Sequence, residues 1–359
     1  MTTSIIGWDI GGANIKAARI SEGQSRPVMH ERAFPLWREP ARLSSVLVDV
    51  AEVLGSAQMM AITMTAELAD CFANKREGVA SVLDALEAAF PDVESWVYGT
   101  DDRFRSVDEA RRHPYKIAAA NWMAGATFVA QTFPDALFLD VGSTTSDIIP
   151  IVGGRVVARG RTDPGRLRSG ELVYTGALRT PIAAIVRTVP FRGRRCRVAA
   201  EYFASSADVH RWLGCIGEDE YTCDTPDGRG RSRSEAGARL ARMVCADFDR
   251  LGDERVTAIA EHVSGAQVRQ IASGLWQVVR RLGPRCPKMA VIAGLGKFLA
   301  RAAADAVGLE VTDLADAMGP DAARATPAAA VAYLLNCRRE SPAESRPDRM
   351  TPAPTGALT

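Results

Sequence analysis

The chain has 359 residues, 47% of them hydrophobic, and a formal net charge of +1. This length and content predict a globular protein with two domains of ordinary size. The near-zero charge excludes a whole-molecule field that attracts nucleic acid or a membrane surface, and no apolar run is long enough for a membrane span. Seven scattered cysteines without a CxxC pair are typical of a reduced chain, and the N-terminus lacks the features of a secretory signal. We therefore expect a cytoplasmic protein.

The first stretch that indicates function is the turn DIGGANIK at residues 9–16, which lies between two apolar runs that predict strands. We interpret Gly11 and Gly12 as positions with backbone angles closed to other residues, whose amides can approach an anion. Lys16 supplies positive charge, and Asp9 could hold a cation. An ordinary β-hairpin that needs glycine only for its turn is the alternative.

The residues after this hairpin predict alternating strands and helices, which favour an α/β domain with a mixed sheet. The predicted elements are a strand at 27–34, a helix at 42–54, a strand at 59–65, a helix at 76–90, a strand at 94–98 and an Ala-rich helix at 115–132. Glu67 follows the strand at 59–65, and Asn121 and Trp122 lie in the Ala-rich helix.

The hairpin pattern occurs a second time at residues 140–147, which read DVGSTTSD between two apolar runs. Such a repeat predicts two related domains that face one cleft. A third strand is expected at 155–161, followed by an irregular, Gly-rich and polar segment at 162–176. A helix is expected to begin near residue 181 and run towards residue 188.

The rest of the second domain contains an arginine-rich segment at 187–197 and an inserted polar region at about 190–250. Within and after it we expect helices at 201–213, 235–249 and 254–281, and a loop at 218–234. An apolar strand at 288–293 runs into Gly294, Gly296 and Lys297 and then a helix, a junction that offers backbone amides and a positive helix end. Packing alone is the alternative reason for these glycines.

These elements divide the chain into a first domain at residues 1–133 and a second at 134–324. A last helix at 325–337 is expected to complete the first domain. The remainder, 338–359, is rich in Pro, Ser and Arg and is expected to be disordered.

The three Gly turns, in the order hairpin, hairpin and strand-to-helix, resemble the phosphate 1, phosphate 2 and adenosine motifs of the actin-like ATPase fold, which is ribonuclease H-like. Longer strings resemble the hydantoinase/oxoprolinase-like group of that superfamily, and within it the one-carbon pathway members linked to tetrahydromethanopterin. The strings are GWDIGGANIK, TMTAELAD, AAANWMA, DVGSTTSDIIPI and ELVYTGALRTP.

The resemblance implies a transferase of methanofuran or methylofuran biosynthesis. Such an enzyme condenses an aminomethylfuran-methanol diphosphate with the phenol oxygen of a tyramine, tyrosine or glutamyl-tyramine acceptor and releases pyrophosphate. Two alternatives stay open: an ATP-dependent small-molecule kinase or hydantoinase-type amidohydrolase, and a nucleotide-gated regulator. The partners of the protein are expected to be small-molecule substrates, and a homo-oligomer is possible.

The implied chemistry assigns roles to the motif residues. The phosphate clamp is expected to comprise Gly11, Gly12, Asn14, Lys16, Gly142, Ser143, Thr144 and Thr145. A Mg²⁺ ion is expected at Asp9 and Asp140, with Asp147 as a further acid, and ATP would join it under the kinase reading. Glu67 is our first choice for the general base, ahead of Asp147 and Asp70, with a helix-capping acid as the alternative.

Further residues are assigned to the substrates. They are Asn121, Trp122, Tyr174, Thr175, Arg179 and Thr180, while Gly294, Gly296 and Lys297 form the nucleotide-like turn. Helix packing is the alternative for Asn121 and Trp122. The arginines of segment 187–197 are expected either to bind a glutamyl carboxylate or to form a solvated basic loop.

Overall fold

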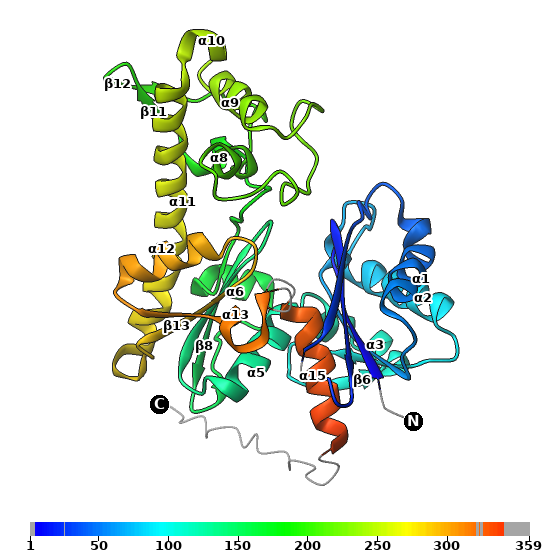
Figure 1. Cartoon of the computed structure of the whole chain (residues 1–359). Helices are drawn as coiled ribbons and strands as arrows, with labels where there is room; N and C mark the ends of the chain where they lie inside the picture. The colour runs from blue at the N-terminus through cyan, green and yellow to red at the C-terminus, as the bar shows by residue number, and fades with distance from the viewer. Residues whose placement is uncertain (1–3, 25, 321–322, 324–325, 341–359) are drawn as a thin grey trace, which may run out of the picture.

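The computed structural model describes residues 4–24, 26–320, 323 and 326–340. Figure 1 shows two sheet domains side by side and a helical lobe above one of them. The first sheet has the strand order β3-β2-β1-β4-β5-β6. Its strands are β1 (Ser4–Ile10), β2 (Asn14–Ser21), β3 (Val28–Ala33), β4 (Met59–Met64), β5 (Glu94–Tyr98) and β6 (Phe104–Ser106).

Alternating side chains of β1 enter two different cores. Ile6, Trp8 and Ile10 pack with the helices α1 (Leu43–Leu54) and α2 (Lys75–Ala89). Ile5 lies on the other face, with the helices α5 (Asn121–Thr132) and α15 (Thr326–Glu340). The short helices η1 (Pro40–Arg42), η2 (Ala66–Leu68), α3 (Val107–Arg112) and α4 (Pro114–Ile117) lie in the connections.

The second sheet repeats the arrangement of the first, because an antiparallel hairpin again adjoins two parallel strands. Its order is β10-β8-β7-β13-β14, with β9 paired to β8. The strands are β7 (Ala136–Val141), β8 (Ser146–Val152), β9 (Arg155–Val156), β10 (Leu172–Val173), β13 (Met289–Ala293) and β14 (Glu310–Asp313). The helix α12 (Lys297–Val307) covers one face, and α13 (Leu314–Met318) follows β14.

One apolar core joins the two domains. It contains Ile5 and Ala18 of the first sheet, Phe138 and Val291 of the second, and the buried faces of α5 and α15. Figure 1 shows these two helices between the sheets. The last helix of the chain therefore packs on the first sheet and also against the second domain.

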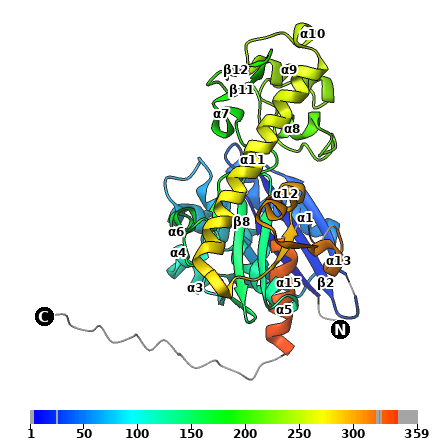
Figure 2. The same cartoon turned by 90° about the vertical axis from the view of Figure 1, so that its left-hand side faces the viewer.

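The lobe forms around the first half of α11 (Asp253–Leu282), a helix that also runs down along the second sheet (Figure 2). The other elements of the lobe are α7 (Ile182–Ile185), β11 (Thr188–Phe191), β12 (Arg194–Arg197), α8 (Ser206–Trp212), α9 (Arg233–Arg242) and α10 (Phe248–Leu251). The inserted region expected at about 190–250 lies in this lobe, and Trp212, Leu240 and Ile259 form an apolar core of the lobe's own.

Several expected elements differ in the structure. The Ala-rich helix at 115–132 is broken into α4 and α5, because Ala119 adopts a left-handed backbone with φ of 51°. The strand expected at 155–161 ends at Val156. The segment 162–176 is not irregular but contains the helix α6 (Asp163–Ser169), followed by β10.

The helix expected at 235–249 also ends early, at Arg242, and Cys245 has φ of 54°. At the other end of the chain, α15 continues through Glu340, so the first three residues of the expected tail are helical. Residues 341–359 lie outside the described part of the chain. Among the described helices, none combines the length and the hydropathy that a membrane span requires.

Candidate active site

The two repeated hairpin turns line one cavity between the domains, with a volume of about 640 Å³. The strand register places the repeated residues at equivalent positions: Asp9 pairs with Lys16 across β1 and β2, and Asp140 pairs with Asp147 across β7 and β8. The clamp residues predicted from the sequence all line this cavity. The second turn therefore carries an acid where the first carries a lysine.

The turn amides correct one part of the predicted clamp. The amide of Gly11 donates to the carbonyl of Asn14 over 3.0 Å, and the amide of Gly142 donates to the carbonyl of Thr145 over 2.9 Å. These two amides close their own hairpins and are not directed at a ligand. By contrast, the backbone N–H groups of Gly12 and Ser143 donate no backbone hydrogen bond in the described part of the chain.

The reason predicted for the glycines is also wrong, because neither Gly11 nor Gly12 has a positive φ. At Gly11 a Cβ atom would lie 2.7 Å from the carbonyl oxygen of Asn14, so the tight turn itself needs glycine. At Gly12 and Gly142 a Cβ atom would meet its nearest neighbour at 3.8 Å. The fold does not require glycine there, and the missing side chains leave room on the cavity side.

Asp9 and Asp140 are acids at the carboxyl ends of β1 and β7. Burial raises the pKa of Asp9 to about 6 and that of Asp140 to about 7, and Lys16 opposes both shifts. Asp147 raises both pKa values further through charge repulsion. The Oδ1 atom of Asp9 is buried without a hydrogen-bond partner in the described chain.

This pair fits a divalent cation whose coordination shell is completed by ligand oxygens and water, because Mg²⁺ in phosphate sites uses one or two protein carboxylates. The described residues contain no group of three or more His, Cys, Asp or Glu side chains arranged around one metal position. The carboxylate of Asp147 forms an ion pair with the buried guanidinium of Arg166. Arg166 also stacks over the ring of Trp122 at 4.4 Å.

Glu67 lies on η2, directly after β4, with its side chain only 1% exposed and lining the cavity. Burial raises the pKa of its carboxyl to about 7, and Lys75 partly opposes the shift. Both carboxylate oxygens lack a hydrogen bond in the described chain, although Lys75 Nζ lies 3.6 Å from Oε1. A buried acid of near-neutral pKa that faces a cavity is suited to proton transfer.

The predicted substrate residues divide into two groups. Asn121, Tyr174 and Arg179 line the cavity, and Tyr174 is 65% exposed at its mouth. Trp122, Thr175 and Thr180 are buried and do not line it. The hydroxyl of Thr180 accepts from the amide of Gly176 over 3.0 Å, and Gln267 donates to Thr175 over 2.8 Å, so these residues support the second turn from behind.

The third Gly turn contributes less to the cavity than the sequence predicts. Gly294 lines the cavity, but a Cβ atom there would lie 2.4 Å from Asp140 Oδ1, and a Cβ atom at Gly296 would lie 2.5 Å from Val141 Cγ1. Packing against the end of β7 therefore explains both glycines. Lys297 does not line the cavity and pairs with Asp313 over 2.7 Å.

Sequence reasoning missed four polar or aromatic residues of the cavity: Trp37, Thr65, Asp163 and Arg166. The two charged residues lie on α6, in the segment expected to be irregular. The signals of a helix were present, because Thr162 caps it by accepting from the amide of Gly165, Pro164 lies in its first turn and Gly170 ends it with φ of 75°. Trp37 faces the second domain, where Arg179 stacks over its ring at 5.1 Å.

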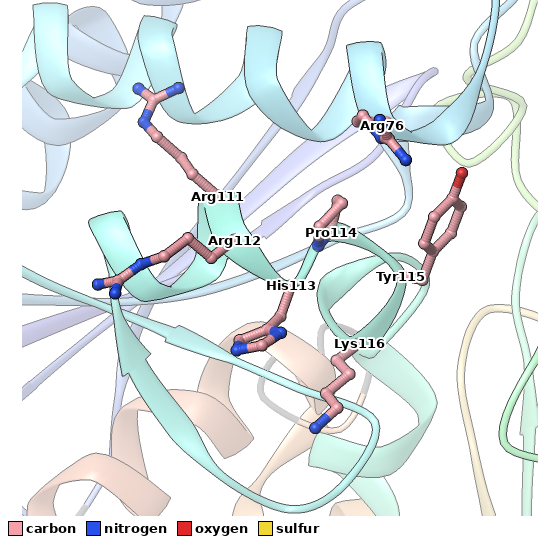
Figure 3. A pocket seen from close by; sticks show the side chains of 7 residues that line it. All are labelled: Arg76, Arg111, Arg112, His113, Pro114, Tyr115 and Lys116. Atoms are coloured by element: carbon pink, nitrogen blue, oxygen red, sulfur yellow. The ribbon is translucent and has the colours of Figure 1, made fainter.

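Two other basic regions lie apart from this site. A cavity of about 520 Å³ is lined by Arg76, Arg111, Arg112, His113, Pro114, Tyr115 and Lys116. Its basic side chains point in different directions (Figure 3), and Arg111 is neutralised by Asp84 and Glu87. The arginines of segment 187–197 lie on β11, β12 and their flanks at the far end of the lobe (Figures 1 and 2), and none lines the cleft cavity.

Comparison with known proteins agrees with this arrangement. Residues 58–336 match the family model described as hydantoinase/oxoprolinase. The chain belongs to the hydantoinase/oxoprolinase family. The synthase of (4-{4-[2-(γ-L-glutamylamino)ethyl]phenoxymethyl}furan-2-yl)methanamine from Methanocaldococcus jannaschii is 36% identical over 93% of this chain and 98% of its own length. The synthase of the same name from Methanococcus vannielii is 32% identical over 58% of this chain and 95% of its own length.

The fold of this hydantoinase/oxoprolinase family member also resembles a solved one. The nucleotide-free structure of acetone carboxylase superposes with a TM-score of 0.50 at 9% identity, over 87% of this chain and 68% of that chain. The two-domain, actin-like α/β fold with mixed sheets, expected from the sequence, is confirmed. Identity this low bears on the fold and not on the ligand.

Proposed function

We propose that this protein is a transferase of methanofuran or methylofuran biosynthesis. It joins an aminomethylfuran-methanol diphosphate to the phenol oxygen of a tyramine, tyrosine or glutamyl-tyramine acceptor and releases pyrophosphate. The observation that carries the proposal is the near full-length identity to a synthase whose named product contains this aryl ether. The cavity supports it, because the cavity combines two phosphate-type turns with a buried base.

In this reaction the carbon–oxygen bond between the furfuryl carbon and the diphosphate breaks, and a new bond forms from that carbon to the phenol oxygen. Negative charge grows on the departing diphosphate, so donors fixed around it lower the barrier. The amides of Gly12 and Ser143, the hydroxyls of Thr144 and Thr145 and the ammonium of Lys16 supply them. All five residues line the cavity.

A Mg²⁺ ion at Asp9 and Asp140 is part of the proposal. When bound, it would neutralise charge on the diphosphate. The fit rests on the buried Oδ1 of Asp9, which has no hydrogen-bond partner in the described chain, and on the raised pKa values of both acids. A bound cation would lower these pKa values, because it favours the ionised carboxylates.

The phenol proton passes to Glu67 in this proposal. A phenol has an ordinary pKa of about 10 and must lose its proton as it attacks. A carboxylate with a pKa of about 7 is a stronger base than an exposed one and is still mostly ionised at slightly alkaline pH. Trp37 and Tyr174 offer aromatic surface for the acceptor ring at the cavity mouth, and Arg179 offers a guanidinium for an acceptor carboxylate.

The test is to incubate the protein with Mg²⁺, the furan diphosphate and each acceptor, and to follow products by mass spectrometry. The proposal predicts one coupled ether and one pyrophosphate per turnover without ATP. Hydrolysis of ATP without formation of the ether would contradict it and favour the kinase or amidohydrolase alternative.

A further inference from the structure

One lysine links the two domains beneath the cavity. Lys75 Nζ lies 2.6 Å from Asp163 Oδ2 and 3.6 Å from Glu67 Oε1. Glu67 and Lys75 belong to the first domain, whereas Asp163 is the first residue of α6 in the second. The same ammonium group therefore contacts the proposed base and an acid from the opposite side of the cleft.

The fold holds both ends of this link in place. On the first domain, the side chain of Asn74 caps α2 by accepting from the amide of Glu77 over 3.0 Å. Gly78 of that helix lies against the backbone of Glu67, where a Cβ atom would come within 2.5 Å of the carbonyl oxygen. Glu67 and the start of α2 are thus fixed relative to each other.

On the second domain, the buried carboxylate of Glu171 anchors the segment that carries Asp163. It accepts from the amides of Arg159 and Gly160 over 2.7 and 2.8 Å and from the hydroxyl of Ser169 over 2.7 Å. Arg281 of α11 pairs with it over 2.6 Å. This anchor is independent of the cavity, so Asp163 is positioned by its own domain.

Lys75 controls the charge around Glu67. The other charged group that acts on this carboxyl is Asp163, and the segment between α4 and α5 presents the backbone amide of Ala119. The Lys75 side chain is 23% exposed, so water screens the pair less than it screens a surface salt bridge.

We propose that Lys75 is a positioning residue, which keeps Glu67 oriented as a base and ties it to the second domain through Asp163. Its ammonium is shared by two carboxylates from opposite sides of the cleft, so the base is complete only when the domains stand as they do here. This inference rests on the function proposed above and goes beyond it, because Lys75 itself does not line the cavity.

The two partners of Glu67 act on its pKa in opposite directions. Lys75 lowers the pKa, and Asp163 raises it. Removal of the lysine charge should therefore shift the acid limb of the pH–rate profile upwards, by about one pH unit for an opposite charge at this distance. Removal of the Asp163 charge should shift the limb downwards by a smaller amount.

The experiment compares the pH dependence of kcat/KM for ether formation in the wild type, Lys75→Met, Lys75→Arg and Asp163→Asn. The proposal predicts an upward shift for Lys75→Met, a limb close to that of the wild type for Lys75→Arg and a downward shift for Asp163→Asn. Lys116→Met is the matched control, because Lys116 pairs with Asp101 at 3.7 Å outside the cavity, and its limb should not move. Identical limbs in all variants would overturn the proposal.

A second readout does not depend on activity. The free energy of unfolding is measured against pH for the wild type and for Glu67→Gln, and the difference between the two is taken at each pH. The same difference is then measured in a pair of proteins that both carry Lys75→Met. A raised pKa makes this difference fall as pH rises from the unfolded pKa and level off above the folded pKa. The levelling point should lie near pH 7 with Lys75 and about one unit higher without it.

The two readouts separate the failure of the inference from the failure of the proposed function. Equal levelling points would overturn the role of Lys75 even in an active enzyme. A moved levelling point in a protein that makes no ether would uphold the control of Glu67 by Lys75 and overturn the transferase assignment alone.

Discussion

Asp9, Glu67 and Asp140 are three of the carboxyl groups that line the cleft, and burial raises the pKa of each. The surroundings of these acids differ, and we expect their roles to differ accordingly. Asp9 and Asp140 lie at the ends of the two hairpins, next to the turns. Glu67 lies on the wall formed by η2, beside a lysine.

The first prediction concerns Glu67→Gln. Loss of a general base should lower kcat by about 10²- to 10⁴-fold. The same change should stabilise the protein above pH 7, because a carboxyl with a raised pKa contributes stability below the unfolded pKa that is lost as pH rises through the folded one. The rise of about 2.5 units corresponds to about 3 kcal/mol.

Steady-state kinetics and urea unfolding at pH 5 and pH 8 check this prediction. A variant that is stabilised at pH 8 but retains full activity would show that Glu67 is buried for structural reasons only.

The second prediction concerns the proposed metal ligands. Pyrophosphate with Mg²⁺ should raise the melting temperature more than pyrophosphate alone, and Asp9→Asn or Asp140→Asn should remove the additional rise. Asp249→Asn is the control, because Asp249 is exposed on α10, away from the cleft. Thermal scans with and without a chelator measure the effect. An additional rise that persists in both cleft variants would exclude these two acids as ligands.

At the scale of elements, the repeated hairpins were readable from the sequence because each carries an acid, a glycine and a hydroxyl or amide group between two apolar runs. Sequence reasoning could not show which turn amides stay free. Gly11 and Gly142 donate within their own turns, and only the geometry separates them from Gly12 and Ser143.

The charged residues of α6 show the other limit of sequence reasoning. Asp163 and Arg166 were missed because a short helix has too few residues for an apolar period, although its capping residues were visible. Lys75 was missed for a different reason. Its partner Asp163 is 88 residues away in the chain and belongs to the other domain, so no local pattern connects the two.

The third prediction concerns the packing of α15 on β1. Gly7 lies where a Cβ atom would come within 2.0 Å of the carbonyl oxygen of Ala328. Gly7→Ala should therefore push α15 off the first sheet and destabilise the protein by about 3 kcal/mol, the upper end for an overpacked core. Because α15 belongs to the core that joins the domains, the cleft should be disturbed as well.

Urea unfolding measures this effect. Gly265→Ala is the control, because its Cβ atom would contact only the Arg269 side chain at 3.4 Å and alanine favours a helix. Equal stability of the Gly7→Ala variant and the wild type would contradict the close packing of α15 on β1.

At the scale of the whole molecule, contacts between the two sides surround the cavity. Lys75 and Asp163 join the domains beneath it, and Arg179 stacks on Trp37 at its mouth. Arg38 also pairs with Asp224 over 3.0 Å, between the first domain and the lobe. A ligand that fills the cavity contacts both sheet domains and should therefore stabilise the protein as a unit.

The fourth prediction uses this linkage to distinguish diphosphate from nucleotide. At 100 times its dissociation constant, pyrophosphate or the furan diphosphate should stabilise the protein by about 2.7 kcal/mol. ATP should add no protection beyond that of its phosphates, because packing explains the glycines of the third turn and Lys297 pairs with Asp313. Thermal unfolding with pyrophosphate, triphosphate and ATP tests the difference, and a larger shift with ATP than with triphosphate would indicate an adenosine site.

The most direct test of the central claim follows the phenol oxygen through the reaction. The enzyme is supplied with Mg²⁺, the furan diphosphate and an acceptor whose phenol oxygen is ¹⁸O, and both products are analysed by mass spectrometry. Attack of the phenol on the furfuryl carbon predicts that all of the ¹⁸O is found in the ether and none in the released pyrophosphate. Label in a phosphorylated acceptor, or ether formation only when ATP is hydrolysed, would contradict a transferase that displaces pyrophosphate.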